Sequence, residues 1–205
     1  MRVLDVEKNA DYYRTVFFLG NEELSLLRHS GELIADQQAQ IFADLYAWMD
    51  AQPYYSRYYT EEVLAAIQAN EAIFWEDAFA GQVDDDFIER QKFFGLIFAE
   101  TDIPYEAYLG FMHYFYRLIL DALAALGHED ALLVRTFKNL VMMVMSIVNE
   151  GYHQASLEAV RRKSEALQAM STPIAQLWDG IILLPVVGFI DSMRASSMMH
   201  EILHY

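Results

Sequence analysis

Apolar side chains recur at helical spacing over most of the chain, from about residue 21 to residue 171. The clearest run would place six apolar side chains on one helix face: Leu24, Leu27, Ile34, Ile41, Leu45 and Trp48. Asn21 is expected to cap this stretch, Gly31 to divide it into two helices, and Pro53 to end it. The pattern therefore predicts an all-α architecture here.

Three more helices are predicted between residues that start or stop a helix. Their expected spans are 60–79, 84–101 and 104–126. Thr60 and Pro104 suit the start of a helix, whereas Gly81 and Gly127 suit the position just after a helix end. Together with the N-terminal stretch, these helices indicate one helical domain of ordinary size.

A single long helix is predicted from Glu129 to Ser171, because that stretch holds no proline and one glycine, Gly151. It would be about 64 Å long at 1.5 Å per residue. A globular domain does not need this length, so the far half is expected to project as a stalk that leaves the domain near Gly151. The stalk carries a weak heptad seam: Leu157, Val160, Ser164, Leu167 and Ser171.

The last 34 residues change character. Residues 174–178 and 181–187, on either side of Asp179-Gly180, predict a β-hairpin with a tight turn. Asp191 is expected to cap a short final helix over residues 192–204. A hairpin and one helix are too small to be stable alone, so we expect this segment to be the start of a domain.

Two helical stretches, 111–120 and 140–148, are apolar around much of their girth. Helices of this kind are buried on more than one side. One side can face the domain core, and a partner subunit best explains the other, which predicts a homodimer. The alternative is a fully buried core helix in a monomer.

The chain is strongly acidic, with 30 Asp and Glu against 14 Lys and Arg and a formal net charge of −16. Such a surface repels phosphate backbones and anionic lipid, so neither nucleic acid nor a membrane is an expected partner. No apolar run free of charges and helix breakers is long enough to span a bilayer, and the first 20 residues do not resemble a signal peptide. A cytoplasmic location is the simplest interpretation.

Cysteine is absent, which excludes disulfides, thiolate catalysis and thiolate metal sites. The chain contains no Gly-rich phosphate loop, no H-E-x-x-H and no Gly-x-Ser-x-Gly motif. We therefore predict no catalytic residue and no enzyme. His200 and His204 are four residues apart, but with no third ligand nearby we predict no metal site.

Several motifs, in order and at similar spacing, resemble the globin-coupled sensor family over about residues 24–148. They are Leu45-Tyr46 for a Phe-Tyr pair, Trp75, Phe79 and Gly81 for Trp-x-x-Leu-Phe-x-Gly, residues 87–98 for a segment ending in Arg-Ile-Gly-x-x-His, and residues 103–109 after it. The resemblance implies a globin-like sensor domain.

This chain differs from that family at the positions that bind haem. The proximal histidine would fall on Phe98, whose phenyl ring has no lone pair for iron. Tyr46 matches the distal tyrosine that hydrogen-bonds bound gas. The resemblance thus implies a sensor globin in which Tyr46 and Phe98 are vestigial haem-pocket positions and no cofactor is bound. His113 is an alternative haem ligand, although a packed or interface histidine is the simpler interpretation.

Residues 184–192 resemble the beginning of a STAS domain. A sensor globin, a helical linker and a STAS domain form the layout of RsbR-type stressosome scaffold proteins, many of which have globin-like domains without haem. In that family a phosphorylated Thr follows an Ile-Asp pair, and Ser192 holds this position here. The resemblance implies phosphorylation of Ser192; a helix-start serine is the alternative.

These observations predict a globin-like sensor domain over residues 1–150, a helical linker over 151–171 and an incomplete STAS-like segment over 172–205. The resemblance implies a non-haem sensory and scaffold module that passes a signal through a dimeric linker to a STAS domain. Its implied partners are other STAS-domain proteins and a regulatory kinase. The alternatives are a haem-based gas sensor and a binder of an apolar small molecule in the vacated haem pocket.

Overall fold

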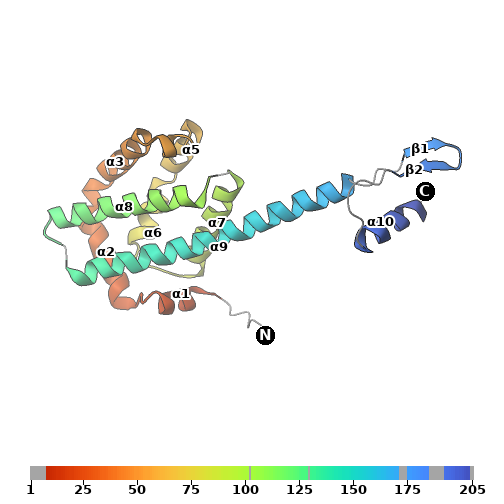
Figure 1. The fold of residues 1–205 in the computed structure, drawn as a ribbon. Helices are drawn as coiled ribbons and strands as arrows, with labels where there is room; N and C mark the ends of the chain where they lie inside the picture. Colours follow the sequence, from red (N-terminus) through yellow and green to blue (C-terminus); the bar gives the residue numbers. More distant parts are fainter. Residues whose placement is uncertain (1–7, 102, 129, 171–174, 185–191, 204–205) are drawn as a thin grey trace. The chain divides into compact units, whose positions relative to one another are not determined.

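The computed structural model describes residues 8–101, 103–128, 130–170, 175–184 and 192–203. Contacts within the chain divide it into two compact units, Met1–Ser156 and Leu157–Tyr205. The first unit consists of helices, and the second contains the end of the longest helix, a β-hairpin and a further helix (Figure 1).

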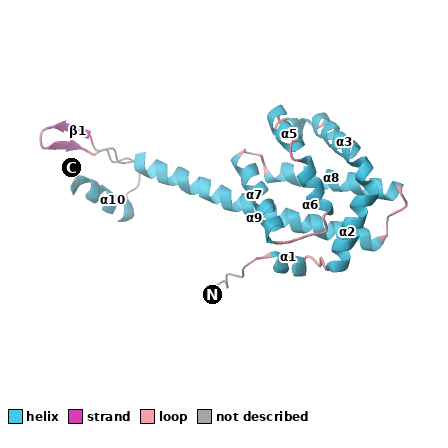
Figure 2. Cartoon of the chain, turned by 180° about the vertical axis from the view of Figure 1, so that it is seen from behind, coloured by secondary structure: helices cyan, strands magenta, loops and turns pink. Residues whose placement is uncertain are grey.

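The helices of the first unit, in chain order, are α1 (Ala10–Val16), α2 (Asn21–Ile34), the 3-10 turn η1 (Ala35–Gln37), α3 (Gln38–Ala51), α4 (Pro53–Ser56), α5 (Glu61–Gln68), α6 (Glu71–Phe79), α7 (Asp85–Glu100), α8 (Tyr105–Ala125) and α9 (Ala131–Met170), which continues into the second unit. Helices α8 and α9 lie side by side in both views and run antiparallel, joined by a short connection (Figures 1 and 2). Helix α3 packs against α8, and α2 packs against α6.

Capping side chains explain several of the helix starts. The Thr60 hydroxyl accepts a hydrogen bond from Val63 N, and the Asp84 carboxylate accepts one from Phe87 N at 2.8 Å. The helix start at Thr60 was predicted. Asn21, in contrast, is the first residue of α2 and not its cap: Gly20 holds the cap position, and its N–H donates to the Glu23 carboxylate at 3.1 Å.

The prediction that Gly31 divides the N-terminal stretch is wrong, because α2 runs through Gly31 and ends only at η1. A Cβ at Gly31 would lie 2.7 Å from Cγ of Phe79, so this glycine permits the close approach of α6. Glycine here serves packing between helices and does not terminate one.

The single helix predicted over residues 60–79 is also wrong, since α5 and α6 are separate helices. The Asn70 side chain donates to the carbonyl of Ala66 at 2.7 Å and so competes with the backbone hydrogen bonds of a continuing helix. Helix α1 was not predicted at all. It is short, and Asn9 caps it by accepting a hydrogen bond from Tyr12 N at 3.0 Å.

Helices α7 and α9 cross at a pair of glycines. A Cβ at Gly95 would lie 2.7 Å from Tyr152 N, and a Cβ at Gly151 would lie 3.0 Å from the carbonyl carbon of Lys92. The backbones of the two helices are therefore in direct contact, each through the other's glycine. The sequence suggested that the stalk leaves the domain near Gly151, and the structure gives this glycine a role in helix packing.

Next to this crossing, α1 is tied to α9 through Glu150. The Glu150 carboxylate accepts hydrogen bonds from Lys8 Nζ at 2.6 Å and from the Tyr13 hydroxyl at 3.0 Å. Burial would raise the pKa of Glu150, but these bonds outweigh it and hold the pKa below its usual value. The backbone N–H of Ala10 also donates to Asp85 at 2.8 Å, which fixes α1 to the start of α7.

Helix α9 has 40 residues, which confirms the prediction of one long helix to within two residues at each end. Contrary to the expectation that no stretch qualifies, α9 contains a window long and apolar enough to cross a membrane. However, 44% of that window is buried inside the protein. The core helix of a folded domain has the same apolar character.

The second unit contains an antiparallel pair, β1 (Ala175–Trp178) and β2 (Ile181–Leu183), and helix α10 (Ser192–Leu203). The predicted turn at Asp179-Gly180 is present, and Gly180 has a positive φ of 74° that suits glycine. The predicted cap Asp191 lies outside the described residues. In the predicted heptad seam, Leu157, Val160 and Ser164 are exposed, and the side chains of the other two members lie outside the described part.

Candidate functional site

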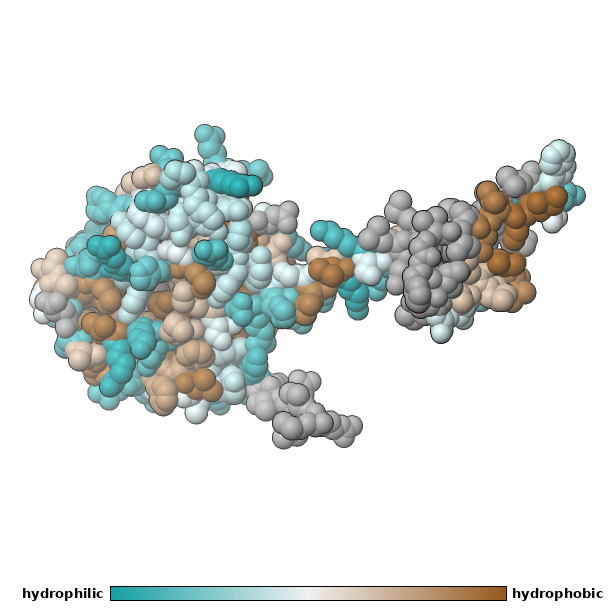
Figure 3. Space-filling view, in the orientation of Figure 1, coloured by the Kyte–Doolittle hydropathy of each residue, from teal (hydrophilic) through white to brown (hydrophobic). Residues whose placement is uncertain are grey.

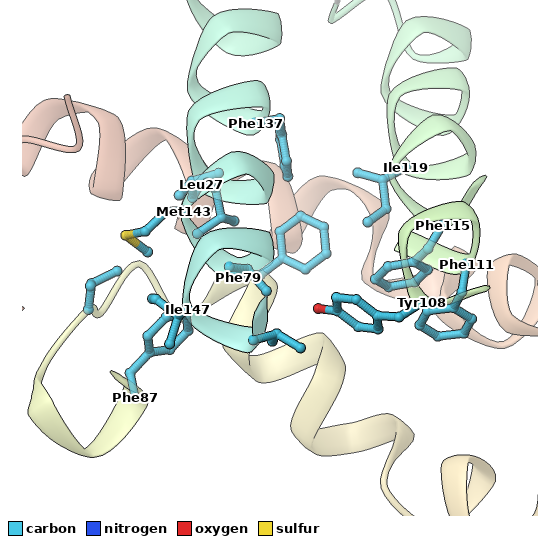
Figure 4. Close-up of a cluster of buried hydrophobic side chains, with 14 of the residues drawn as sticks. Leu27, Phe79, Phe87, Tyr108, Phe111, Phe115, Ile119, Phe137, Met143 and Ile147 are labelled. Atoms are coloured by element: carbon cyan, nitrogen blue, oxygen red, sulfur yellow. The ribbon is translucent and has the colours of Figure 1, made fainter. Parts of the chain in front are cut away.

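A mostly apolar cavity lies between α8 and α9 and is lined as well by α3, α6 and α7. The centre of a water molecule can reach about 50 Å³ of it. Its lining residues are Phe42, Phe74, Asp77, Ala78, Gln91, Phe94, Tyr108, Phe111, Met112, Phe115, Tyr116, Ile119, Phe137, Leu140, Val141 and Val144. Figure 4 shows Tyr108, Phe115 and Ile119 of α8 pointing toward α9, which carries Phe137.

Stacked aromatic rings form most of the wall. Phe42 stacks on Phe115 with ring centroids 5.3 Å apart, and Phe74 stacks on Phe94 at 5.0 Å. Phe111 continues the stack beside Phe115. Ring pairs at these separations contribute stability in addition to that gained by burying their apolar surface. The rings that form the wall are therefore held in place by their contacts with one another.

One corner of the cavity is polar. Gln91 Nε2 donates to Asp77 Oδ2 at 2.6 Å, and the Arg90 guanidinium donates to Asp77 Oδ1 at 2.8 Å. The Asp77 side chain is 10% exposed and that of Arg90 46%. Burial raises the pKa of the Asp77 carboxyl above its usual value, and the hydrogen bonds from Arg90 and Gln91 partly offset this shift. The buried carboxylate is thus satisfied by two partners.

A second polar group enters from α8. Tyr108 is 3% exposed, and its ring reaches toward α9 with the hydroxyl at the tip (Figure 4). Within the described part of the chain, this hydroxyl has no hydrogen-bond partner. Burial holds the pKa of Tyr108 well above its usual value, so the phenol keeps its proton.

Neither of the two predicted haem-pocket positions lines the cavity. Phe98 is buried against Tyr108, with ring centroids 5.0 Å apart, and so stands behind the cavity wall. Tyr46 is half-buried and donates to the Glu71 carboxylate at 2.6 Å. Its hydroxyl is therefore satisfied by a side chain of the protein itself.

The other two predicted site residues lie away from the cavity. His113 is exposed, although its neighbour Met112 lines the cavity. Ser192 is exposed and is the first residue of α10, in the second unit. Among the described residues, no group of three His, Asp or Glu side chains could hold a metal ion.

Sequence reasoning missed three of the polar residues that line the cavity, Asp77, Gln91 and Tyr108. Gln91 did carry a signal, because it stands on the apolar face of α7 between Phe87 and Phe94. The sequence around Asp77 and Tyr108 gave no such signal. Their role depends on the tertiary arrangement of α6, α7 and α8.

The cavity does not fit a haem held as in sensor globins. Gln91 and Phe94 are the α7 residues in its lining, and neither is a haem ligand; no histidine of the described segments lines it. Tyr108 could ligate iron only as a phenolate, which burial disfavours. A macrocycle would also have to displace the stacked rings.

Comparisons with known proteins agree with this fold. The Protoglobin family model matches residues 6–158. The globin domain of the Geobacter sulfurreducens globin-coupled sensor superposes with a TM-score of 0.63, at 13% identity, over 70% of this chain and 97% of that domain. This confirms the predicted globin-like fold.

A stretch of 60 residues is 33% identical to the RsbT co-antagonist protein RsbRD of Bacillus subtilis (strain 168). The stretch is 29% of this chain and 22% of that relative. The similarity therefore spans about a fifth of the relative's length.

Proposed function

Because this chain belongs to the Protoglobin family, we propose that it is a sensory and scaffold module of the RsbR type whose globin-like domain works without haem. The observation that carries the proposal is the cavity, which is walled by stacked rings around a satisfied Asp77 and lined by no histidine of the described residues. By the resemblance, Phe98 falls at the proximal position. The stretch similar to RsbRD supports the stressosome assignment.

Helix α9 is the element that would pass the signal. It lines the cavity with Phe137, Leu140 and Val144 and continues past the boundary of the first unit to Met170. A change in the packing around the cavity therefore acts directly on a helix that reaches the second unit. Interfaces between packed helices switch between discrete arrangements, which suits a two-state signal.

The second unit would report the signal to other proteins. By its resemblance to the start of a STAS domain, we expect its partners to be STAS-domain proteins and a regulatory kinase in the cytoplasm, with no enzymatic activity of its own. Ser192 is exposed at the first turn of α10, where a phosphate would meet the positive end of the helix dipole.

Haem titration of the purified chain tests the haem-free proposal. No Soret band is expected as isolated, and added haem is expected to give no saturable 1:1 complex, because the cavity offers no axial histidine. His113→Ala is the control for adventitious binding, since His113 is the exposed histidine next to the cavity residue Met112. A saturable 1:1 complex that persists in His113→Ala would overturn the proposal in favour of a haem-based gas sensor.

A homodimer through the outer faces of α8 and α9 completes the proposal. Val134 is 40% exposed and Met142 is 51% exposed on α9, and Leu120 and Met145 are half-buried. Figure 3 shows brown apolar patches between polar ones on the face that carries these helices. Apolar surface of this kind marks an interaction site.

Met142→Glu is expected to weaken the dimer at least about tenfold, because the interface would bury an unpaired charge. Val16→Glu, at an exposed apolar residue on α1, is the matched control and is expected to leave the dimer unchanged. Analytical ultracentrifugation over a range of concentrations measures both. A stable monomer for the unmodified chain at micromolar concentration would show that the interface is assigned wrongly.

A further inference from the structure

The hydroxyl of Tyr108 forms no hydrogen bond within the described part of the chain, and its side chain lines the cavity. Tyr108 is 97% buried, being 3% exposed, and no described residue accepts from or donates to its oxygen. The atom lies in the wall of the cavity, so a molecule within the cavity can reach it.

Gln91 offers a complementary group in the same wall. The Asp77 carboxylate can only accept hydrogen bonds, so the amide NH₂ of Gln91 must face it, at 2.6 Å. This fixes the amide orientation and leaves the Gln91 carbonyl oxygen without a partner among the described residues. Gln91 is 4% exposed and lines the cavity. The wall thus presents one donor and acceptor on Tyr108 and one acceptor on Gln91.

We propose that this cavity binds a small neutral molecule with an apolar body and one hydroxyl group, held by Tyr108 and Gln91. The inference rests on the proposed haem-free function and names the class of its ligand. The aromatic rings select an apolar body. The carboxylate of Asp77 disfavours an anion, and its pairing with Arg90 and Gln91 leaves no charge for a cation to neutralise.

The centre of a water molecule reaches about 50 Å³ of the cavity, less than the roughly 150 Å³ of an engineered cavity that holds benzene, so a ligand with one small ring must widen the cavity on binding. A ligand hydroxyl has two kinds of partner in this lining: it can donate to the Gln91 carbonyl or accept from the Tyr108 hydroxyl. The ligand's ring would contact side chains of α9 such as Phe137 and Val144, which also line the cavity. Binding would therefore change the packing of the helix that leaves the unit.

The test uses 4-fluorophenol and fluorobenzene, two probes that differ by one hydroxyl, followed by fluorine NMR on the full chain. Tyr108→Phe removes the unpartnered oxygen and keeps the ring. Tyr116→Phe is the matched control, because Tyr116 also lines the cavity but its hydroxyl donates to the Val134 carbonyl at 3.0 Å. Circular dichroism of both variants establishes that they are folded.

The unmodified chain is expected to bind 4-fluorophenol saturably and more tightly than fluorobenzene. Tyr108→Phe should weaken 4-fluorophenol about tenfold and leave fluorobenzene unchanged, whereas Tyr116→Phe should change neither. If 4-fluorophenol does not bind saturably, or binds Tyr108→Phe as tightly as the unmodified chain, the inference is wrong. Those outcomes leave the haem-free proposal standing, since that proposal fails only when haem itself binds.

Discussion

Gly151→Ala is expected to destabilise the helical unit by about 1–3 kcal/mol, although alanine favours an isolated helix by about 1 kcal/mol over glycine. A Cβ at this position meets the backbone of Lys92, and a Cβ at Gly95 meets the backbone of Val148 and Tyr152. Backbone atoms cannot rotate aside, so α7 and α9 must separate. Gly95→Ala should therefore lower the free energy of unfolding by about the same amount.

Gly110→Ala is the matched control for these two substitutions. Gly110 also lies within a helix, but a Cβ there meets only the far end of the Tyr55 side chain, which can move. Its cost should stay below about 1 kcal/mol. Urea denaturation of the three variants measures the difference. Equal stability of Gly151→Ala and Gly110→Ala would contradict the prediction, because it would show that α7 and α9 can move apart without loss of stability.

Phe137→Ala is expected to cost about 3–5 kcal/mol, the range for deleting a buried phenylalanine ring. Phe137 is 1% exposed and contacts Phe79 and Tyr116, with ring centroids 5.6 and 5.9 Å away. It also lines the cavity, so its removal enlarges a space that the surrounding rings cannot close. The free energy of unfolding from urea denaturation is the measurement.

Phe93→Ala is the control, because Phe93 is the same residue type on α7 but 59% exposed. Its cost should be within about 0.5 kcal/mol. Phe137→Leu keeps part of the volume and is expected to be intermediate, which gives a measurable value if Phe137→Ala does not fold. Similar losses for Phe93→Ala and Phe137→Leu would contradict the placement of Phe137 in the core.

The parts of the fold that the sequence predicted well are those with strong local signals. Asp84 and Pro104 stand at the starts of α7 and α8, and the lack of proline across α9 revealed its length. The errors arose where one side chain overrides periodicity. Asn70 separates α5 from α6 through a single hydrogen bond, and Gly31 serves packing while the helix continues.

The candidate site was harder to predict, because its walls come from five helices. The motif around Phe98 predicts that the proximal position holds no histidine, but it could not locate the cavity, from whose lining Phe98 is absent. Tyr108 and Asp77 acquire their roles only when α6, α7 and α8 pack together. Gln91 alone could have been noticed, as a polar residue on an apolar helix face.

The reciprocal contact at Gly95 and Gly151 has a consequence for how related sequences diverge. Each glycine is constrained by the backbone of the opposite helix, so neither position can gain a side chain while the other helix stays in place. Relatives that keep this crossing are expected to hold glycine at both positions. Relatives that have lost one glycine are expected to have lost the other as well. An aligned set of homologues would reveal the two positions changing together.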